Sequence, residues 1–119
     1  MKIMFLDDDP NRHTQLMSAL VGFDSSVDWA QTAQEAIKFL SSNEYDIIYL
    51  DHDLGGKIMV ESGEETGYEV AKWINDNMEN LPPIVIHSLN PVGVQNMLNV
   101  LPTAKAIPFY TLIIKLRSI

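Results

Sequence analysis

Two short apolar runs, each stopped by a cluster of acidic residues, constrain the fold of this chain most strongly. The runs and the clusters that follow them are KIMFL before Asp7-Asp8-Asp9 and IIYL before Asp51-His52-Asp53. Segments that are apolar at almost every position are typical of strands buried on both faces of a parallel sheet. We therefore expect a parallel sheet with helices on both sides and with acidic residues at the ends of two strands.

Segments with strand character alternate with segments of helical character along the chain. Strands are expected at residues 2–6, 26–30, 46–51, 84–87 and 104–109. The expected helices begin at polar caps followed by Pro or, three residues on, by Glu: Asp9-Pro10, Thr32 with Glu35, Thr66 with Glu69, and Asn90-Pro91. The chain left after the last strand is enough for a short helix. This pattern predicts one doubly wound α/β domain over residues 1–119, with right-handed crossovers between its strands.

The composition is that of a soluble domain with an excess of acidic residues. The chain has 119 residues, 46% of them apolar, and a net charge of −8. No apolar stretch approaches the ~20 residues of a membrane helix and the N-terminus lacks the pattern of a leader, so we expect no membrane contact and a cytoplasmic location. An acidic chain is poorly suited to direct binding of double-stranded DNA, which needs cationic patches. The absence of cysteine excludes disulfides and thiolate metal ligands.

The acidic clusters indicate a site for a divalent cation. Ligands of open parallel sheets bind outside the carboxyl ends of the strands, where both clusters lie. Carboxylates gather in one crevice only if a cation neutralises them or if some of them stay protonated. We assign Asp7, Asp8, Asp51 and Asp53 as candidate ligands of Mg²⁺, or of another hard cation such as Mn²⁺. Asp9 is better explained as the cap of the first helix.

Two histidines and two polar side chains complete the candidate site. His52 lies inside the second acidic cluster, and His87 ends the fourth expected strand. Each could act as a general acid or base near neutral pH, and each could instead be a hydrogen-bonded structural group. Asp51 is the candidate nucleophile. Ser88 and Asn90 are candidate phosphate contacts, because the Asn90 turn leads into a helix N-terminus that favours an anion.

Over essentially its whole length, the chain resembles a receiver domain of the response-regulator type. The matching positions are the acidic pair Asp7-Asp8, the phosphoacceptor Asp51, the metal-binding carbonyl of Asp53, the helix-opening Gly67 and the strand-ending Ser88. The resemblance implies a five-stranded parallel sheet of order 2-1-3-4-5, a magnesium ion and a reactive Asp51.

One position departs from the receiver pattern. The lysine that receiver domains carry before a proline at the end of the fifth strand aligns with Ile107, and Lys105 stands two residues earlier. In the family that lysine pairs with the acidic pocket or with the phosphoryl group, so its absence argues against ordinary phosphoryl signalling. The phrases LDHDLG, TGYEV and HSLNPVG resemble a divergent subgroup, the cyclic-phosphate-processing receiver domains. This resemblance implies action on a cyclic phosphate end.

The sequence leaves three functions open. The first, favoured by the two histidines and by Ile107, is a stand-alone receiver-fold protein that binds a divalent metal and binds or cleaves a phosphoester. Its ligand would be a phosphate-containing small molecule or an RNA end, and the polar loop at residues 55–66 could cover it. The second is a single-domain response regulator phosphorylated on Asp51. The third is a degenerate receiver that only binds a partner protein; exposed apolar residues of the last helix would also permit a homodimer.

Overall fold

Strand β1 (Lys2–Leu6) lies inside a five-stranded parallel sheet, with β2 (Ser26–Ala30) on one side and β3 (Ile47–Leu50) on the other. The sheet continues through β4 (Ile84–Ile86) to β5 (Lys105–Ala106). This computed structural model describes every residue from 1 to 119. The predicted α/β fold and the predicted strand order 2-1-3-4-5 are confirmed.

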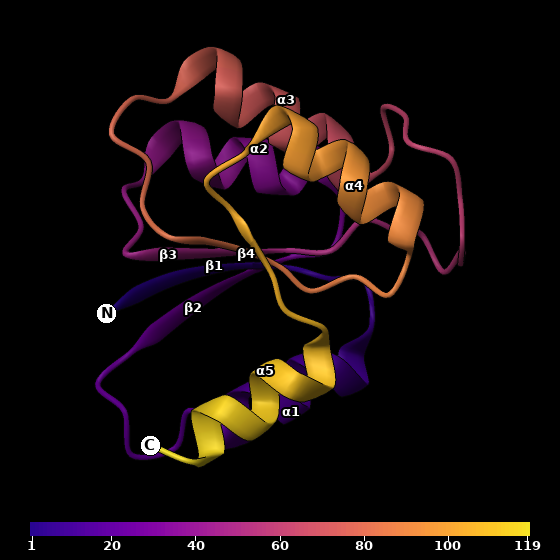
Figure 1. Ribbon diagram of the computed structural model, residues 1–119. Coiled ribbons are helices and arrows are strands. Elements are labelled where there is room, and N and C mark those ends of the chain that lie inside the picture. Colours follow the sequence, from indigo (N-terminus) through magenta and orange to yellow (C-terminus); the bar gives the residue numbers. More distant parts are fainter.

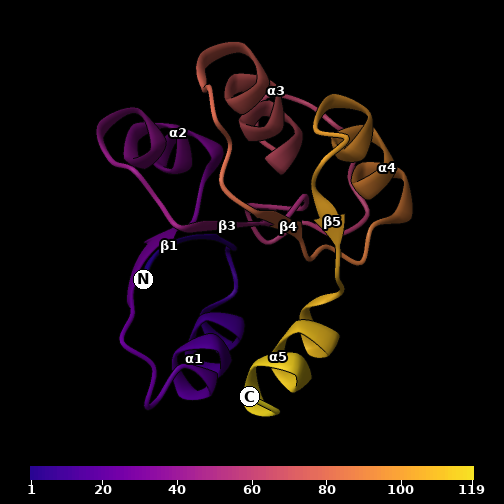
Figure 2. The ribbon, with the colours of Figure 1, turned by 60° about the vertical axis from the view of Figure 1, so that its left-hand side comes forward.

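Helices cover both faces of the sheet. On one face lie α2 (Ala33–Ser42), α3 (Gly67–Asn77) and α4 (Pro91–Val100), and on the other lie α1 (Pro10–Ala19) and α5 (Phe109–Arg117) (Figure 1). Figure 2 shows the same two layers from a second direction, with the sheet between them. None of these helices has the length and apolar character needed to cross a membrane.

The strand β1 is buried on both faces, as its unbroken apolar sequence predicts. Met4 and Leu6 belong to the core beneath α2, α3 and α4, whereas Ile3 and Phe5 belong to the core beneath α1 and α5. Successive side chains of a strand point to opposite faces, so a slip of one residue would exchange the two sets. The register of β1 is therefore fixed from both sides, and with it the point at which Asp7 leaves the sheet.

The last strand is shorter than expected. The predicted strand at residues 104–109 is reduced to Lys105–Ala106, because Pro108 has no backbone N–H and already caps α5. The final helix is short, as expected, with nine residues. Leu112 and Ile113 are buried while Ile119 is exposed, so part of the apolar surface at this end of the chain stays open to solvent.

The predicted helix starts are present, with one difference in detail. Asp9 caps α1 by accepting a hydrogen bond of 2.8 Å from a backbone N–H of the first turn. Thr66 caps α3, but the predicted pairing of Glu69 with this cap is wrong, because Glu69 forms an ion pair with Lys72 at 3.3 Å. The N–H of Thr66 donates to the carbonyl of Gly63, so no donor remains there for Glu69.

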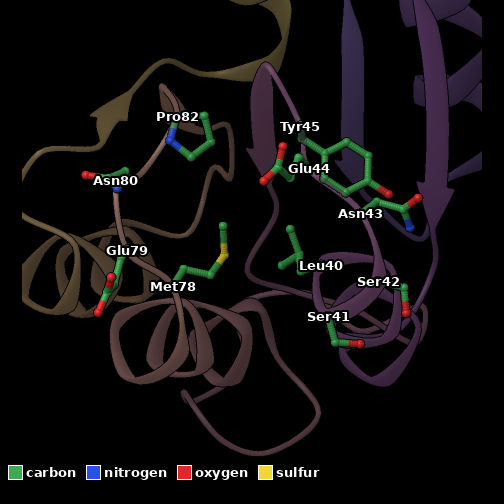
Figure 3. Close-up of a pocket in the computed structure, with 10 residues that line it drawn as sticks. All are labelled: Leu40, Ser41, Ser42, Asn43, Glu44, Tyr45, Met78, Glu79, Asn80 and Pro82. Atoms are coloured by element: carbon green, nitrogen blue, oxygen red, sulfur yellow. The ribbon is translucent and has the colours of Figure 1, made fainter.

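A large hollow lies at the amino ends of β3 and β4, away from both acidic clusters. Its volume is about 580 Å³, and it is lined by the end of α2, the segment that leads into β3 and the turn after α3 (Figure 3). Its two acids, Glu44 and Glu79, are exposed, and its lining contains no histidine, lysine or arginine. This hollow therefore lacks the buried charges that would mark a catalytic site.

Candidate functional site

Three carboxylates meet where β1 and β3 end. The two strands are neighbours, with Leu6 opposite Leu50, so Asp7, Asp8 and Asp51 leave the sheet side by side. Each offers an oxygen, and these oxygens all lie within 4.8 Å of one another. Asp7 and Asp51 are buried, and Asp8 is half-buried. Three of the four predicted metal ligands are thus brought together.

A guanidinium group already lies among these carboxylates. Arg12, in the first turn of α1, donates through Nε to Asp7 Oδ2 at 2.7 Å and through Nη2 to Asp7 Oδ1 at 2.9 Å. The same Nη2 lies 3.4 Å from Asp51 Oδ2 and 3.7 Å from Asp8 Oδ1. The hydrogen bond with Asp7 raises the pKa of Arg12 despite its partial burial. We call Asp7, Asp8, Arg12 and Asp51 the acidic site.

The sequence reasoning missed Arg12, although a signal was present. Arg12 follows Asp8 by four residues and Asp9 by three at the start of a helix, and such spacings place side chains on one face. Charge pairs of this kind are common on helices, so the spacing alone does not distinguish a surface pair from a buried one. The distinction depends on how α1 is rotated against the sheet.

Asp51 carries the strongest electrostatic perturbation among the acids of this site. Burial, together with the charge of Asp7, raises the pKa of Asp51 to about 8, against the opposing effects of Arg12 and of the His52 backbone N–H. That N–H donates to Asp51 Oδ1 at 2.8 Å. Without a metal, burial therefore favours the protonated form of Asp51. A hard cation such as Mg²⁺ prefers carboxylate oxygens and would replace this proton, so the three carboxylates fit such an ion.

A pocket of about 200 Å³ opens beside the acidic site. Its lining includes Asp51, His87 and Ser88, which are predicted site residues, together with Arg12 and with Lys57 from the 55–66 loop. The hydroxyl of Ser88 accepts a hydrogen bond from the following backbone at 3.1 Å, which leaves its own proton free for an anion. Two predicted catalytic residues and one predicted phosphate contact thus share a single pocket, and Asp53, a predicted metal ligand, also lines it.

His87 is buried beside the acidic site. Its ring stacks on Phe5 with centroids 5.3 Å apart, and Nε2 lies 3.2 Å from the carbonyl oxygen of Leu6. Burial lowers the pKa of His87 to about 4, so the ring is neutral at neutral pH. Since Nε2 faces a carbonyl, it carries the proton, and Nδ1, which lies 3.8 Å from Asp7 Oδ2, has a free lone pair. His87 is therefore a neutral ring whose Nδ1 faces the acidic site.

His52 lies in a different environment. Its fully buried ring hydrogen-bonds Asp53 Oδ1 through Nδ1 at 2.7 Å and Ser62 Oγ through Nε2 at 2.8 Å, and it does not line the pocket. Asn90 donates to Asp53 Oδ1 at 3.0 Å and to the carbonyl of Val60 at 3.0 Å. Ser62 and Val60 belong to the 55–66 loop. We call His52, Asp53, Ser62 and Asn90 the loop anchor, because they hold that loop against the rest of the protein.

The hydrogen bonds of the loop anchor occupy two more of the predicted site residues. Asp53 lies outside the group of three carboxylates, and its second oxygen accepts the N–H of Met59 at 2.6 Å. Although burial opposes ionisation, hydrogen bonds from Asn90, His52 and Met59 lower the pKa of Asp53. The amide oxygen of Asn90 caps α4 by accepting the N–H of Gly93 at 3.0 Å. Asn90 thus has its polar atoms directed into the protein.

Two glycines allow helices to approach the end of β3 closely. A Cβ at Gly67 would lie 1.7 Å from the carbonyl oxygen of Asp51, and a Cβ at Gly93 would lie 2.4 Å from the ring of His52. The N–H of Gly67 also donates to the His52 carbonyl at 2.9 Å. Any larger residue at either position would displace the segment that carries Asp51 and His52.

The fifth strand supplies no cation to the pocket. Ile107, at the position of the family's lysine, packs against the core beneath α1 and α5. Lys105 is exposed and does not line the pocket. The cationic side chains that line it are Arg12 and Lys57, from α1 and from the loop. No residue of β5 therefore replaces the positive charge of the family's lysine in the pocket.

A protein-family model matches most of the chain. Residues 2–103 match the family model of the cyclic-phosphate processing receiver domain. The chain belongs to this family. A curated relative of this receiver domain is the transcriptional regulatory protein LytR of Staphylococcus aureus (strain N315), which is 36% identical over 75 residues. Those residues cover 60% of this chain but 28% of LytR, so the chain spans well under a third of that relative.

Solved structures of response regulators share the fold of this receiver domain. Response regulator TrrA from Thermotoga maritima, solved in complex with Mg²⁺ and BeF, has a TM-score of 0.71 and 22% identity over 90% of this chain and 84% of its own. A two-component response regulator from Clostridium difficile has a TM-score of 0.74 and 24% identity over 99% and 93%. The Mn²⁺-bound form of response regulator Rcp1 has a TM-score of 0.74 and 18% identity over 98% and 89%. At these identities the likeness concerns the fold.

Proposed function

We propose that this receiver domain binds Mg²⁺, or a similar divalent cation, through Asp7, Asp8 and Asp51, and that it cleaves a cyclic phosphoester in the adjacent pocket. The observation that carries the proposal is the meeting of three carboxylates beside a pocket that also contains His87 and Ser88. The family description supports the choice of substrate. When bound, the cation would supply positive charge that polarises a phosphate oxygen.

The residues of the pocket suit a hydrolytic ring opening. Water attacks phosphorus, one ring P–O bond breaks, and a proton passes from the water to the departing oxygen. His87, neutral and with a free lone pair at Nδ1, accepts the proton of the water and returns it to the departing oxygen. The free hydroxyl proton of Ser88 donates to a phosphate oxygen. His52, which lies outside the pocket lining, then supports this arrangement by holding the loop and does not react.

The test is a turnover assay with 2′,3′-cyclic nucleotides, with and without MgCl₂, followed by ³¹P NMR of the product. We expect Mg²⁺-dependent turnover that is lost in Asp51→Asn and in His87→Asn. The matched control is His13→Asn, because the ring of His13 stacks on Trp29 at 4.0 Å outside the pocket. Turnover that survives His87→Asn would remove His87 from the mechanism.

A second function, that of a phosphorylated switch, is favoured by the position of Asp51. Its carboxyl lies among the other two acids and shares a pocket with Ser88, and these are the residues that match the receiver pattern. Incubation with acetyl phosphate or with beryllium fluoride separates the two functions. A stoichiometric adduct on Asp51 without turnover of cyclic nucleotides would support the switch. Silence in both assays would leave a module that binds a partner protein.

The partners follow from these alternatives. Receiver domains often bind other proteins or form dimers, and Ile114 and Ile119 are exposed at the last helix and just after it. We propose a phosphate-containing small molecule or an RNA end as the ligand, in a cytoplasmic protein. Sedimentation velocity would test the homodimer, since replacement of Ile114 by Lys should yield monomers.

A further inference from the structure

The geometry points to Arg12 as a residue with two positions: it neutralises the acidic site when the metal is absent and binds the phosphate when the metal is present. In the second position it supplies the positive charge that Ile107 cannot. This inference rests on the proposed function, because it assumes that a divalent cation and a phosphate share the site.

Competition between Arg12 and a divalent cation follows from the contacts of the guanidinium group. Arg12 forms a two-pronged hydrogen bond with Asp7 at 2.7 and 2.9 Å, and its Nη2 lies within 3.7 Å of both Asp8 and Asp51. These three carboxylates are the whole group that could hold the metal. Two cations held by the same oxygens would repel each other, and the repulsion is strong because these oxygens are largely buried from water. The guanidinium group must therefore yield when the ion binds.

The pocket gives Arg12 a place to go. The side chain of Arg12 is 29% exposed, whereas those of Asp7 and Asp51 are 0% and 6% exposed. Arg12 is therefore the partner in these ion pairs that has room to move. Arg12 also lines the pocket that contains Ser88. A guanidinium group there can bind two phosphate oxygens at once, which makes it well suited to a phosphate ligand.

The rest of the pocket makes this role necessary. A phosphate needs compensating charge, and neither Ile107 nor Lys105 lines the pocket. Lys57 does line it, but Lys57 belongs to the exposed part of the 55–66 loop and forms no ion pair with the site. Arg12, by contrast, lines the pocket and is held there by its hydrogen bonds with Asp7.

A purely structural role for Arg12 makes a different prediction. If Arg12 only stabilised the fold, its removal would weaken every ligand or none. If Arg12 has two positions, Arg12→Gln should tighten Mg²⁺ binding, because a competitor is gone, and should weaken phosphate binding, because a partner is gone. Opposite signs in one variant are the signature of the second case.

The experiment measures Mg²⁺ binding by calorimetry, and then inorganic phosphate binding at saturating Mg²⁺ by ³¹P NMR. In Arg12→Gln we expect Mg²⁺ to bind about tenfold or more tightly and phosphate about tenfold or more weakly. Arg12→Lys should retain part of the phosphate affinity. The matched control is Arg117→Gln, since Arg117 lies at the exposed end of α5 and donates to Ser18. This control should change neither affinity.

A rescue variant keeps the inference open to refutation. Ile107→Lys, added to Arg12→Gln, places a lysine at the family's position and should restore phosphate binding in a chain whose melting temperature shows that it is folded. Equal losses of both affinities in Arg12→Gln, or no change in either, would overturn the role assigned to Arg12. If Arg12→Gln binds Mg²⁺ more tightly and phosphate more weakly but the protein cleaves no cyclic ester, the role of Arg12 is supported and the proposed enzyme activity is refuted.

Discussion

The acidic site and the loop anchor are two polar clusters of four residues at the same edge of the sheet, and they behave in opposite ways. In the acidic site three carboxylates share one guanidinium group, and the pKa of Asp51 is raised to about 8. In the loop anchor donors face acceptors, and the pKa of Asp53 is lowered. Unbalanced charge in a pocket indicates a binding site, whereas a satisfied buried network indicates a structural role.

The boundary between the two clusters runs through three consecutive residues. Asp51 contacts Arg12 of α1, whereas His52 packs against Gly93 of α4, on the other face of the sheet. Residues 51–53 follow the end of β3, and Asp53 both lines the pocket with Asp51 and hydrogen-bonds His52, so one acidic cluster in the sequence is divided between two structures. Proximity along the chain therefore says little about which of these residues act together.

The largest expected effect comes from Asp51→Asn, which attacks the acidic site alone. We expect turnover to fall about a thousandfold or more, because in the proposed function Asp51 would hold the cation beside the substrate. We also expect the metal-free protein to become more stable at pH 7, by roughly 1–3 kcal/mol, because the cost of burying an acid is removed. The measurements are the rate with cyclic nucleotides and urea unfolding without metal.

The opposite signs of these two effects make the test of Asp51 sharp. Asp46→Asn is the control, because Asp46 is exposed and binds the N–H of Lys2 at the far end of β3. A variant at Asp51 that lost both activity and stability would mean that Asp51 belongs with the loop anchor as a structural group.

The second effect comes from Asn90→Ala, which attacks the loop anchor. Asn90 makes hydrogen bonds of 3.0 Å to Asp53, to Val60 and from Gly93, and their loss leaves buried polar groups unsatisfied. We expect unfolding in urea to cost about 2–4 kcal/mol less. Mg²⁺ affinity should change by less than about threefold, because Asn90 lies outside the acidic site.

Asn99→Ala controls for the change of an asparagine on α4. Asn99 is exposed and accepts a hydrogen bond from Gln95, so its loss should cost less than about 0.5 kcal/mol. If Asn90→Ala kept full stability and lost Mg²⁺ binding, the two clusters would be one functional unit and the comparison would be wrong.

The fold was predictable because local sequence and tertiary burial agree. The run at residues 2–6 is apolar at almost every position, and β1 is buried on both faces, so a single pattern gives both strand and layer. The strand order came from a family resemblance, since a strand pattern does not say which neighbours pair. The fifth strand was overextended because its alternation continues to Phe109, whereas Pro108 begins the helix cap.

The site was predictable only in part. Asp7, Asp8 and Asp51 followed from the rule that parallel strands bring their carboxyl ends together, and that rule is local to the sheet. Which of two strand-ending histidines faces the pocket depends on the side to which each ring turns, and Ser62 reaches His52 from a loop ten residues away. Arg12 required the rotation of α1 against the sheet. The direction of each histidine ring and the rotation of α1 depend on how helices, loop and sheet pack together. A single sequence does not specify that packing.

The third effect is a pH dependence of the acidic site. The pKa of Asp51 is about 8 in the folded protein against an ordinary 3.8, so between these values the folded state binds a proton that the unfolded state lacks. Stability without metal should therefore fall as pH rises from 6 to 8, by at most about 1.4 kcal/mol per unit. A bound Mg²⁺ would displace that proton, so its affinity should rise with pH, up to about tenfold per unit below pH 8.

Calorimetry at pH 6, 7 and 8 in buffers of different ionisation enthalpy would measure both the affinity and the protons released. Asn90→Ala should keep this slope and Asp51→Asn should lose it, which separates the two clusters by a second observable. A flat profile in the unmodified protein would mean that Asp51 is ionised without metal, held so by Arg12.

The smallest expected effect, from Lys105→Gln, locates the edge of the acidic site. Lys105 is exposed on β5, pairs with Val85 in the sheet and does not line the pocket. We expect phosphate affinity at saturating Mg²⁺ to change by less than about twofold, because an exposed charge outside the pocket is screened by salt. The measurement is the same ³¹P titration at 10 and 150 mM NaCl, with Lys115→Gln as the control. A tenfold loss confined to Lys105→Gln would show that this side chain reaches the phosphate, and the charge assigned to Arg12 would then come from β5.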